Sequence, residues 1–324
     1  MWTRVVRLAA TAMLCVPVWG MAQTKWDLAS ANPPTNFQTI NLDRFIAEVD
    51  RATSGAVKIT HHPNASLFKM NEIRRATQQG QVAIGEVFMG TLVNDFPLFA
   101  FDNVPFLLNS RAEANRFWEI VRPALEARLA SQGMTLLYAQ PWPAQGLYST
   151  KPVERVDDLK GTRWRAQAPV FSRYAQAVGA QPSSIPYTEL SQAIVTGAIN
   201  SMMSGVTAAA DLKFWDSMRY FYDLQAAFPY NIVFANTKLF NALPDATRAQ
   251  IRKVAQDNQA ASIKAILQLE QQQLKFIIDN GMVVRPASAD LLKGLRGAAE
   301  PVIAEWVKSA GAEAQNALDQ FRKR

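Results

Sequence analysis

The chain has 324 residues, of which 49% are hydrophobic, 10% aromatic and 19% charged, with 15 Gly and 17 Pro. A disordered chain would contain fewer apolar residues, and a collagen-like or low-complexity chain would contain far more Gly and Pro, so these classes are excluded. The formal net charge is +7, but the basic residues are scattered along the chain, so no nucleic-acid partner is expected. This length allows two domains.

The N-terminal residues 1–22 are predicted to be a signal peptide. Arg4 and Arg7 precede an apolar stretch, residues 8–18, which is too short to span a bilayer, and small residues precede a cleavage site after Ala22. The only cysteine, Cys15, lies in this stretch, so we expect no disulfide and no cysteine-based metal site in the mature chain. We therefore expect a periplasmic protein that begins at Gln23.

The first half of the mature chain alternates short apolar runs with amphipathic stretches, a rhythm that is typical of a mostly parallel sheet with helices on both faces. Gly55, Gly80 and Gly133 follow the helical stretches as stop signals. A kink or a break is expected at Pro123. Strands are predicted at residues 25–29, 56–60, 82–89 and 134–140, and helices at residues 38–53, 70–79 and 111–132.

The same rhythm restarts after Pro141-Trp142-Pro143, which indicates a second α/β unit. Strands are predicted at residues 162–166, 181–185 and 199–201, and helices at residues 169–178 and 187–196. Residues 244–279 then contain no Gly and no internal Pro, which predicts a helix of about 54 Å at 1.5 Å per residue. The alternative for this segment is a coiled coil, but we favour a spine helix that lies across two lobes.

Known catalytic and nucleotide-binding signatures are absent from the sequence: it has no G-x-S-x-G, H-E-x-x-H, G-x-G-x-x-G or G-x-x-x-x-G-K-[ST] motif. The two histidines, His61 and His62, are adjacent, so on a strand they point to opposite faces and do not suit a metal pair. We expect neither a metal nor a cofactor. An exported α/β chain of this kind favours ligand binding in a cleft between two lobes.

A set of ordered motifs resembles one known family. The run Asp158-Leu-Lys-Gly-Thr-Arg-Trp-Arg165 is similar to the D-L-K-G-x-[KR]-x-R element of the solute-binding proteins that serve tripartite ATP-independent periplasmic (TRAP) transporters, the DctP-like family. Further matching elements extend over nearly the whole mature chain: Gly80, Val104-Pro-Phe106, Val178-Gly-Ala180, Tyr187-Thr-Glu-Leu-Ser-Gln-Ala193, Thr196-Gly197, Lys213-Phe-Trp-Asp216 and Asn241-Ala-Leu-Pro244.

The resemblance implies an α/β, two-lobed periplasmic binding protein with a central ligand cleft and a long helix spanning both lobes. We expect residues 23–142 plus 230–270 to form lobe I. Residues 143–229 plus 271–324 are then expected to form lobe II. The protein would carry a small carboxylate to the small and large membrane subunits of a TRAP transporter.

Arg165 is the main candidate for ligand binding. In the family, the arginine of the motif forms a salt bridge with the ligand carboxylate, and Arg165 occupies the matching position. A guanidinium offers a planar fork that suits a carboxylate and stays charged when it is buried. Arg163 lies on the same strand face and is expected to be structural, whereas Trp164 points to the opposite face.

Three further ligand contacts are carried over from the resemblance. Gln145, on the segment that joins the lobes, stands where relatives often place a second polar group. Tyr187 resembles an aromatic residue that lines the cleft in relatives. Ser204 stands where many relatives have an asparagine that contacts the ligand, and this departure puts the usual hydrogen bond in question. No second arginine is matched, which argues against a dicarboxylate.

Other candidate contacts follow from their place in the chain. Trp142 lies next to Gln145 and either faces the ligand or packs in the hinge. Phe88 and Glu86 lie at the end of the predicted 82–89 strand, where lobe I should reach the cleft. Glu86 would accept a hydrogen bond from the ligand or pair with a nearby Lys or Arg. Trp142, Trp164, Tyr187 and Phe88 together suggest an apolar body behind the carboxylate.

The favoured function is thus an extracytoplasmic solute-binding protein, not an enzyme, that delivers a small organic acid to a TRAP-type importer. Three alternatives stay open at this point. The first is a binding protein of an ATP-driven importer, and the second is the ligand-sensing partner of a receptor. The third is a secreted enzyme that uses carboxylates such as Glu86 and Glu189.

Overall fold

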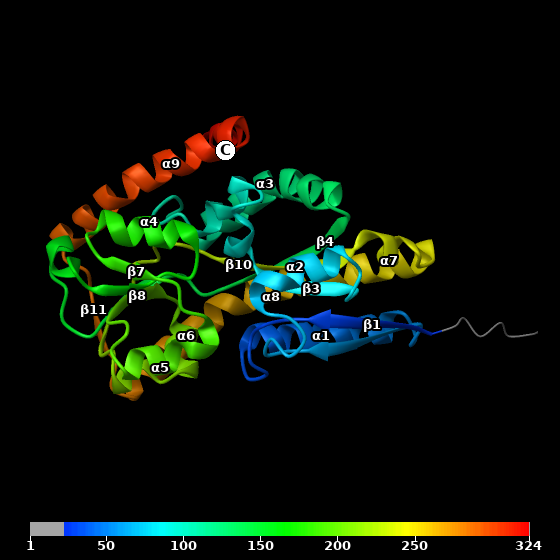
Figure 1. The fold of residues 1–324 in the computed structure, drawn as a ribbon, viewed down its shortest axis with the longest axis horizontal. Helices are drawn as coiled ribbons and strands as arrows, with labels where there is room; N and C mark the ends of the chain where they lie inside the picture. The colour runs from blue at the N-terminus through cyan, green and yellow to red at the C-terminus, as the bar shows by residue number, and fades with distance from the viewer. Residues whose placement is uncertain (1–22, 324) are drawn as a thin grey trace, which may run out of the picture.

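The computed structural model describes residues 23–323, so the predicted signal peptide and its cleavage site lie outside the described residues. The first of two sheets has the strand order β2-β1-β3-β10-β4 (Figure 1). We call this sheet and the helices packed on it the first lobe. Its strands are β1 (Thr24–Ala29), β2 (Val57–His62), β3 (Ile84–Phe88), β4 (Met134–Pro141) and β10 (Tyr230–Asn236).

The second sheet has the strand order β11-β9-β5-β8-β6-β7, and with its helices it forms the second lobe. Its strands are short and enclose an apolar core around Tyr148, Ile199 and Met202. The strands of this sheet are β5 (Gly146–Ser149), β6 (Arg163–Arg165), β7 (Gln181–Ser183), β8 (Ser201–Ser204), β9 (Tyr220–Tyr222) and β11 (Val283–Arg285).

Both sheets are mostly parallel, as predicted, with one strand in each sheet that runs against the others. In the first lobe, β1 runs parallel to β2 and β3, but β10 is antiparallel to β3 and β4. In the second lobe, β6 is parallel to β7 and β8, whereas β5 is antiparallel to β8 and β9. The antiparallel strands β5 and β10 each follow a crossing of the chain from one lobe to the other, from β4 to β5 and from β9 to β10.

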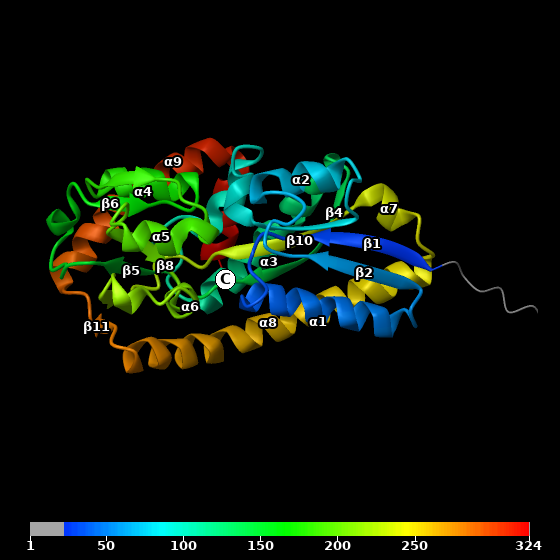
Figure 2. The same cartoon turned by 60° about the horizontal axis from the view of Figure 1, so that its bottom comes forward.

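The helices cover both faces of the sheets (Figures 1 and 2). Helix α3 continues through Pro123 without a break, in contrast to the alternative of a broken helix. The α-helices are α1 (Phe37–Ala52), α2 (Met70–Gln78), α3 (Arg111–Ser131), α4 (Pro169–Ala177), α5 (Leu190–Val195), α6 (Val206–Asp211), α7 (Thr237–Asn241), α8 (Asp245–Asp279) and α9 (Ala289–Arg322). The 3-10 helices are η1 (Met89–Leu92), η2 (Pro97–Asn103), η3 (Val156–Leu159), η4 (Tyr187–Glu189) and η5 (Phe214–Asp216).

Helix α8 is the predicted spine, and it lies across both lobes (Figure 2). Its first half packs on β4 and α1, where Ile251 and Ala255 join the core of the first lobe. Further along it packs on α6, and Ile277 joins the core of the second lobe. The helix has 35 residues and ends before Asn280-Gly281, because Gly281 takes a φ of +100° that a residue with a Cβ adopts only under strain.

Helix α9 was not predicted, because Pro301 and several glycines interrupt its sequence. It bends at Gly311, which has non-helical φ/ψ angles. The helix packs on α4 and also on α3 and η2, with Trp306 buried against Phe117. It therefore lies against helices that the predicted lobe boundaries assign to different lobes, and those boundaries stay a prediction.

Candidate ligand-binding site

A cavity of about 650 Å³ lies between the two lobes. Parallel strands of both sheets end at it, as open α/β sheets generally place their ligands. Its first-lobe lining follows β1, β2 and β3, and its second-lobe lining follows β6, β7 and β8. The lining residues are Ala31, Asn32, Ala65, Lys69, Met70, Asn71, Phe88, Thr91, Trp142, Gln145, Arg165, Gln167, Ser184, Ile185, Pro186, Tyr187, Thr188, Glu189, Ser204, Gly205, Ala208 and Pro229.

Arg165 is the last residue of β6 and lines this cavity, with only 7% of its surface exposed. Its Nε donates a hydrogen bond to the carbonyl of Ile185 at 3.1 Å, which fixes the plane of the guanidinium. Within residues 23–323, no carboxylate lies within 4.0 Å of it. Burial lowers the pKa of Arg165 to about 10, so the group is still protonated at neutral pH. A buried cation at a cavity wall favours an anionic ligand.

Side-chain amides lie beside Arg165 in the wall of the cavity. Gln145 is buried, and its Nε2 donates to the carbonyl of Pro143 at 3.0 Å. Its Oε1 accepts from Nε2 of Gln167 at 3.2 Å, and that same nitrogen lies 3.3 Å from the carbonyl oxygen of Met203. Ser204 is 5% exposed and also lines the cavity. These groups offer neutral donors and acceptors in the same wall as the charge of Arg165, and the other charged lining residues, Lys69 and Glu189, have opposite signs.

Aromatic side chains form another part of the wall. The rings of Trp142 and Tyr187 are tilted against each other, with centroids 6.3 Å apart. The indole Nε1 of Trp142 donates to Oδ1 of Asn231 at 2.6 Å, so the tryptophan both lines the cavity and packs at the junction of the lobes. Phe88 lines the cavity from the end of β3. These rings give the cavity flat apolar surfaces that suit a planar or cyclic ligand body.

Glu86 lies elsewhere than expected. It is fully buried in β3, it does not line the cavity, and its carboxylate accepts a hydrogen bond from Nδ2 of Asn231. Asn231 in turn holds the indole of Trp142, so Glu86 stands one residue behind the wall. No Lys or Arg of residues 23–323 pairs with it. Trp164 was expected to contribute an apolar surface to the ligand, but it is fully buried on the other face of β6.

Burial gives Glu86 a measurable pH signature. Desolvation raises the pKa of Glu86 to about 7, although the hydrogen bond from Asn231 acts in the opposite direction. The folded protein therefore holds one proton more than the unfolded chain between about pH 4.5 and pH 7, and the free energy of unfolding falls as the pH rises through this window. Glu86→Gln removes this effect, so we expect it to raise the free energy of unfolding at pH 8 by up to about 3 kcal/mol.

Urea unfolding of both proteins at pH 4.5 and pH 8 measures this difference. The gain of Glu86→Gln should be present at pH 8 and nearly absent at pH 4.5. The exposed Glu300→Gln is the matched control and should change little at either pH. An equal difference between wild type and Glu86→Gln at the two pH values would show that Glu86 does not titrate in this way.

Several lining residues were missed by the sequence analysis. Gln167 follows Arg165 by two residues, and the period of a strand could have indicated it as a neighbour of Arg165. Asn32 follows the end of β1 in the same way. Lys69 and Asn71, at the start of α2, and Thr91 carried no signal in their local sequence. Within residues 23–323, no group of three or more His, Cys, Asp or Glu side chains could hold a metal ion.

Comparisons with known proteins agree with this geometry. The family described as bacterial extracellular solute-binding protein, family 7 (DctP) matches residues 28–309. The chain belongs to this family. The resemblance to DctP-like solute-binding proteins of TRAP transporters is thereby confirmed, and so is the two-lobed α/β fold.

Solved structures of the family include matches to almost the whole chain. DctP6 of Bordetella pertussis, an extracytoplasmic solute receptor that binds pyroglutamic acid, is 38% identical with a TM-score of 0.90, and the match covers 93% of this chain and 100% of DctP6. A marine metagenome TRAP solute-binding protein specific for pyroglutamate is 33% identical with a TM-score of 0.90, covering 93% of this chain and 99% of that protein. Among curated sequences, the uncharacterized protein YiiZ of Salmonella typhimurium is 25% identical. The match covers 62% of this chain and 63% of YiiZ.

Proposed function

We propose that this family 7 protein is the extracytoplasmic receptor for a small monocarboxylic acid, with pyroglutamate as the first candidate, and that it delivers this acid to a TRAP-type importer. The observation that carries the proposal is the buried, protonated Arg165, which lines a cavity between the lobes and has no carboxylate partner among residues 23–323. It is supported by the likeness to two receptors named for pyroglutamate, at 38% and 33% identity over almost the whole chain.

The chemistry of the cavity suits this ligand class. The guanidinium of Arg165 would bind the carboxylate through two hydrogen bonds. The rings of Trp142, Tyr187 and Phe88 would lie against the five-membered lactam ring. The lactam N–H and C=O need one acceptor and one donor, and Gln145 and Gln167 carry both kinds of atom. The charged lining residues are Arg165, Lys69 and Glu189, which sum to one positive charge, and this suits a single carboxylate better than two.

Binding would act by closing the lobes. The cavity lining comes from both lobes, so a ligand held on Arg165 gains its first-lobe contacts, such as Phe88, only when the first lobe approaches. The closed state is then stabilised by its differential affinity for the ligand. Helix α8, which packs on both lobes, would bend or pivot during this motion.

The family supports the proposed location and partners. A periplasmic site of action is consistent with an extracellular solute-binding family and with the predicted signal peptide. None of the helices in residues 23–323 has the length and apolarity needed to cross a bilayer. The closed receptor would dock on the small and large membrane subunits of the transporter. The family match favours this importer over an ATP-driven one, and it favours binding over catalysis.

A thermal-unfolding screen of residues 23–324 tests the proposal. Pyroglutamate at about one hundred times its dissociation constant should add about 2.7 kcal/mol of stability and raise the melting temperature by roughly 5 °C. 2-Pyrrolidinone, which has the same ring without the carboxylate, should give no shift, and succinate should give a smaller one. A protein that responds to none of a broad panel of carboxylates would contradict the proposed function.

A further inference from the structure

One carboxylate connects the two lobes beside the ligand cavity. The amide Nδ2 of Asn36 donates a hydrogen bond to Oδ2 of Asp211 at 3.0 Å, and the hydroxyl of Tyr187 donates to the same oxygen at 3.0 Å. Asn36 precedes α1 in the first lobe, whereas Tyr187 and Asp211 belong to the second lobe. A side chain of the first lobe is thereby joined, through Asp211, to a residue that lines the cavity.

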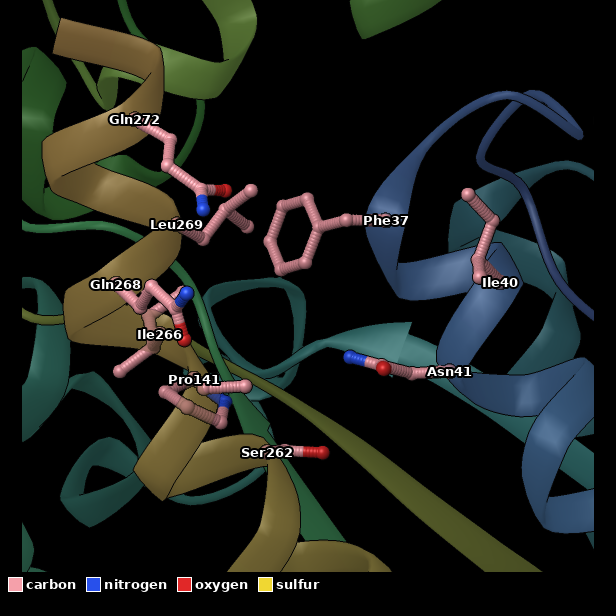
Figure 3. Close-up of a pocket in the computed structure, with 10 residues that line it drawn as sticks. Phe37, Ile40, Asn41, Pro141, Ser262, Ile266, Gln268, Leu269 and Gln272 are labelled. Carbon is pink, nitrogen blue, oxygen red and sulfur yellow. The ribbon is translucent and has the colours of Figure 1, made fainter.

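Aromatic contacts complete a ring around this connection. Phe37, the residue after Asn36, lies edge-on to Trp142 with centroids 5.0 Å apart, and Trp142 packs against Tyr187. Figure 3 shows Phe37 pointing from α1 toward Leu269 of α8, in a second cavity of about 280 Å³ that no charged side chain lines. The start of α1 thus supplies both a polar and an aromatic contact to one wall of the cleft.

Asn36 has the chemistry that this double role needs. It is the N-cap of α1, and its Oδ1 accepts a hydrogen bond from the backbone N–H of Gln38 at 3.0 Å. An acceptor is all that a cap requires, so Ser or Asp would cap equally well. An asparagine has a donor left over, and only 1% of Asn36 is exposed, so this donor is held toward Asp211.

Asp211 stands where helix geometry alone disfavours it. It is the last residue of α6, and a negative charge at a helix C-terminus is unfavourable. No Lys or Arg of residues 23–323 lies within 4.0 Å of its carboxylate. The donors that satisfy it are Asn36 and Tyr187. Burial, followed by the charge of Asp211, raises the pKa of Tyr187 well above its usual value, so its hydroxyl is protonated and able to donate.

We propose that Asp211 is a positioning residue. It accepts a hydrogen bond from Asn36 when the lobes meet, and it thereby holds the ring of Tyr187 against the bound ligand. The proposal rests on the proposed function, because it concerns ligand retention in the same cavity. When the lobes separate, the hydrogen bond from Asn36 to Asp211 breaks. Asp211 then keeps only the hydrogen bond from Tyr187, and the ring of Tyr187 is held less firmly. Removing either partner of the Asn36–Asp211 bond should therefore speed ligand dissociation more than it slows association.

A double-mutant cycle tests this role. The variants are Asn36→Ser, Asp211→Ala and the double variant, and calorimetry and stopped-flow fluorescence give their pyroglutamate affinities and dissociation rates. Each single change should weaken binding about fivefold, mainly through faster dissociation, and the double variant should lose no more than one single variant does. Asn36→Ser keeps the helix cap, so a role in capping alone would leave the affinity unchanged. Tyr187→Phe keeps the ring and should show a similar loss.

Asp216→Ala, which removes another exposed aspartate of the same lobe, is the matched control and should bind like wild type. Single variants that bind within twofold of wild type, or losses that multiply in the double variant, would overturn the role of Asp211. If wild type binds no carboxylate, the proposed function fails separately. The same variants are then compared by their free energies of unfolding in urea. Non-additive losses support the hydrogen bond between Asn36 and Asp211, and additive losses overturn it.

Discussion

Arg165→Ala is expected to weaken pyroglutamate binding at least about thirtyfold, which corresponds to the lower end of a loss of about 2–5 kcal/mol. The loss is large because the ligand carboxylate would be held in the cavity without the buried guanidinium that balances its charge. The guanidinium has no carboxylate partner of its own among residues 23–323, so removing it breaks no salt bridge there. Calorimetry of residues 23–324 measures the effect.

Two further variants make this test specific. Arg165→Lys keeps the charge but loses the planar fork, so an intermediate loss is expected. Arg322→Ala removes an exposed arginine near the C-terminus, whose nearest acidic group is Asp319 at 3.9 Å, and should bind like wild type. Equal affinities of wild type and Arg165→Ala would mean that the guanidinium supports the second lobe and does not contact the ligand.

Trp164→Ala is expected to lower the free energy of unfolding by about 3–5 kcal/mol. Trp164 is completely buried beneath β6, where its ring lies edge-on to Tyr174 with centroids 6.2 Å apart. Alanine would leave a cavity directly behind the strand that carries Arg165. Urea unfolding, followed by circular dichroism, measures the change.

Trp215→Ala is the matched control for this prediction. Trp215 is only half-buried and lies edge-on to Phe276, itself 48% exposed, so a clearly smaller loss of stability is expected. A Trp164→Ala variant as stable as Trp215→Ala would argue that the core beneath β6 relaxes around the missing ring. In that event Arg165 would rest on a more adaptable support than the structure indicates.

Local patterns in the sequence predicted the elements whose signals are local. Helices α1, α2, α3, α4 and α8 lie within one or two residues of their predicted ranges, because their apolar residues follow the helical period and Gly or Asn-Gly ends them. Predicted strand β8 is shifted, at Ser201–Ser204 and not at residues 199–201, because the whole run from Ile199 to Ser204 except Asn200 is buried and carries no alternation.

Other elements depend on contacts that the local sequence does not contain. Strands β5 and β10 have no parallel neighbour, and each is defined by partners from distant parts of the chain. Helix α9 contains Pro301 and Gly311, which locally disfavour a helix, yet burial of Leu291, Leu295 and Trp306 stabilises it. Packing energy outweighs propensity in this case.

The sequence alone determined the α/β class from the alternation of apolar runs and amphipathic stretches, and the spine helix from a run without Gly or internal Pro. It also indicated Arg165 as the carboxylate-binding candidate, through the resemblance of its motif to a known family. Only the tertiary structure decided that Glu86 lies behind Asn231 and that Asp211 meets Asn36. Burial and hydrogen bonding depend on which distant segments approach one another. A residue at the end of a strand has the same local sequence whether its side chain faces the cleft or the core. Contacts with β10, for Glu86, and with the start of α1, for Asp211, decide where these side chains lie.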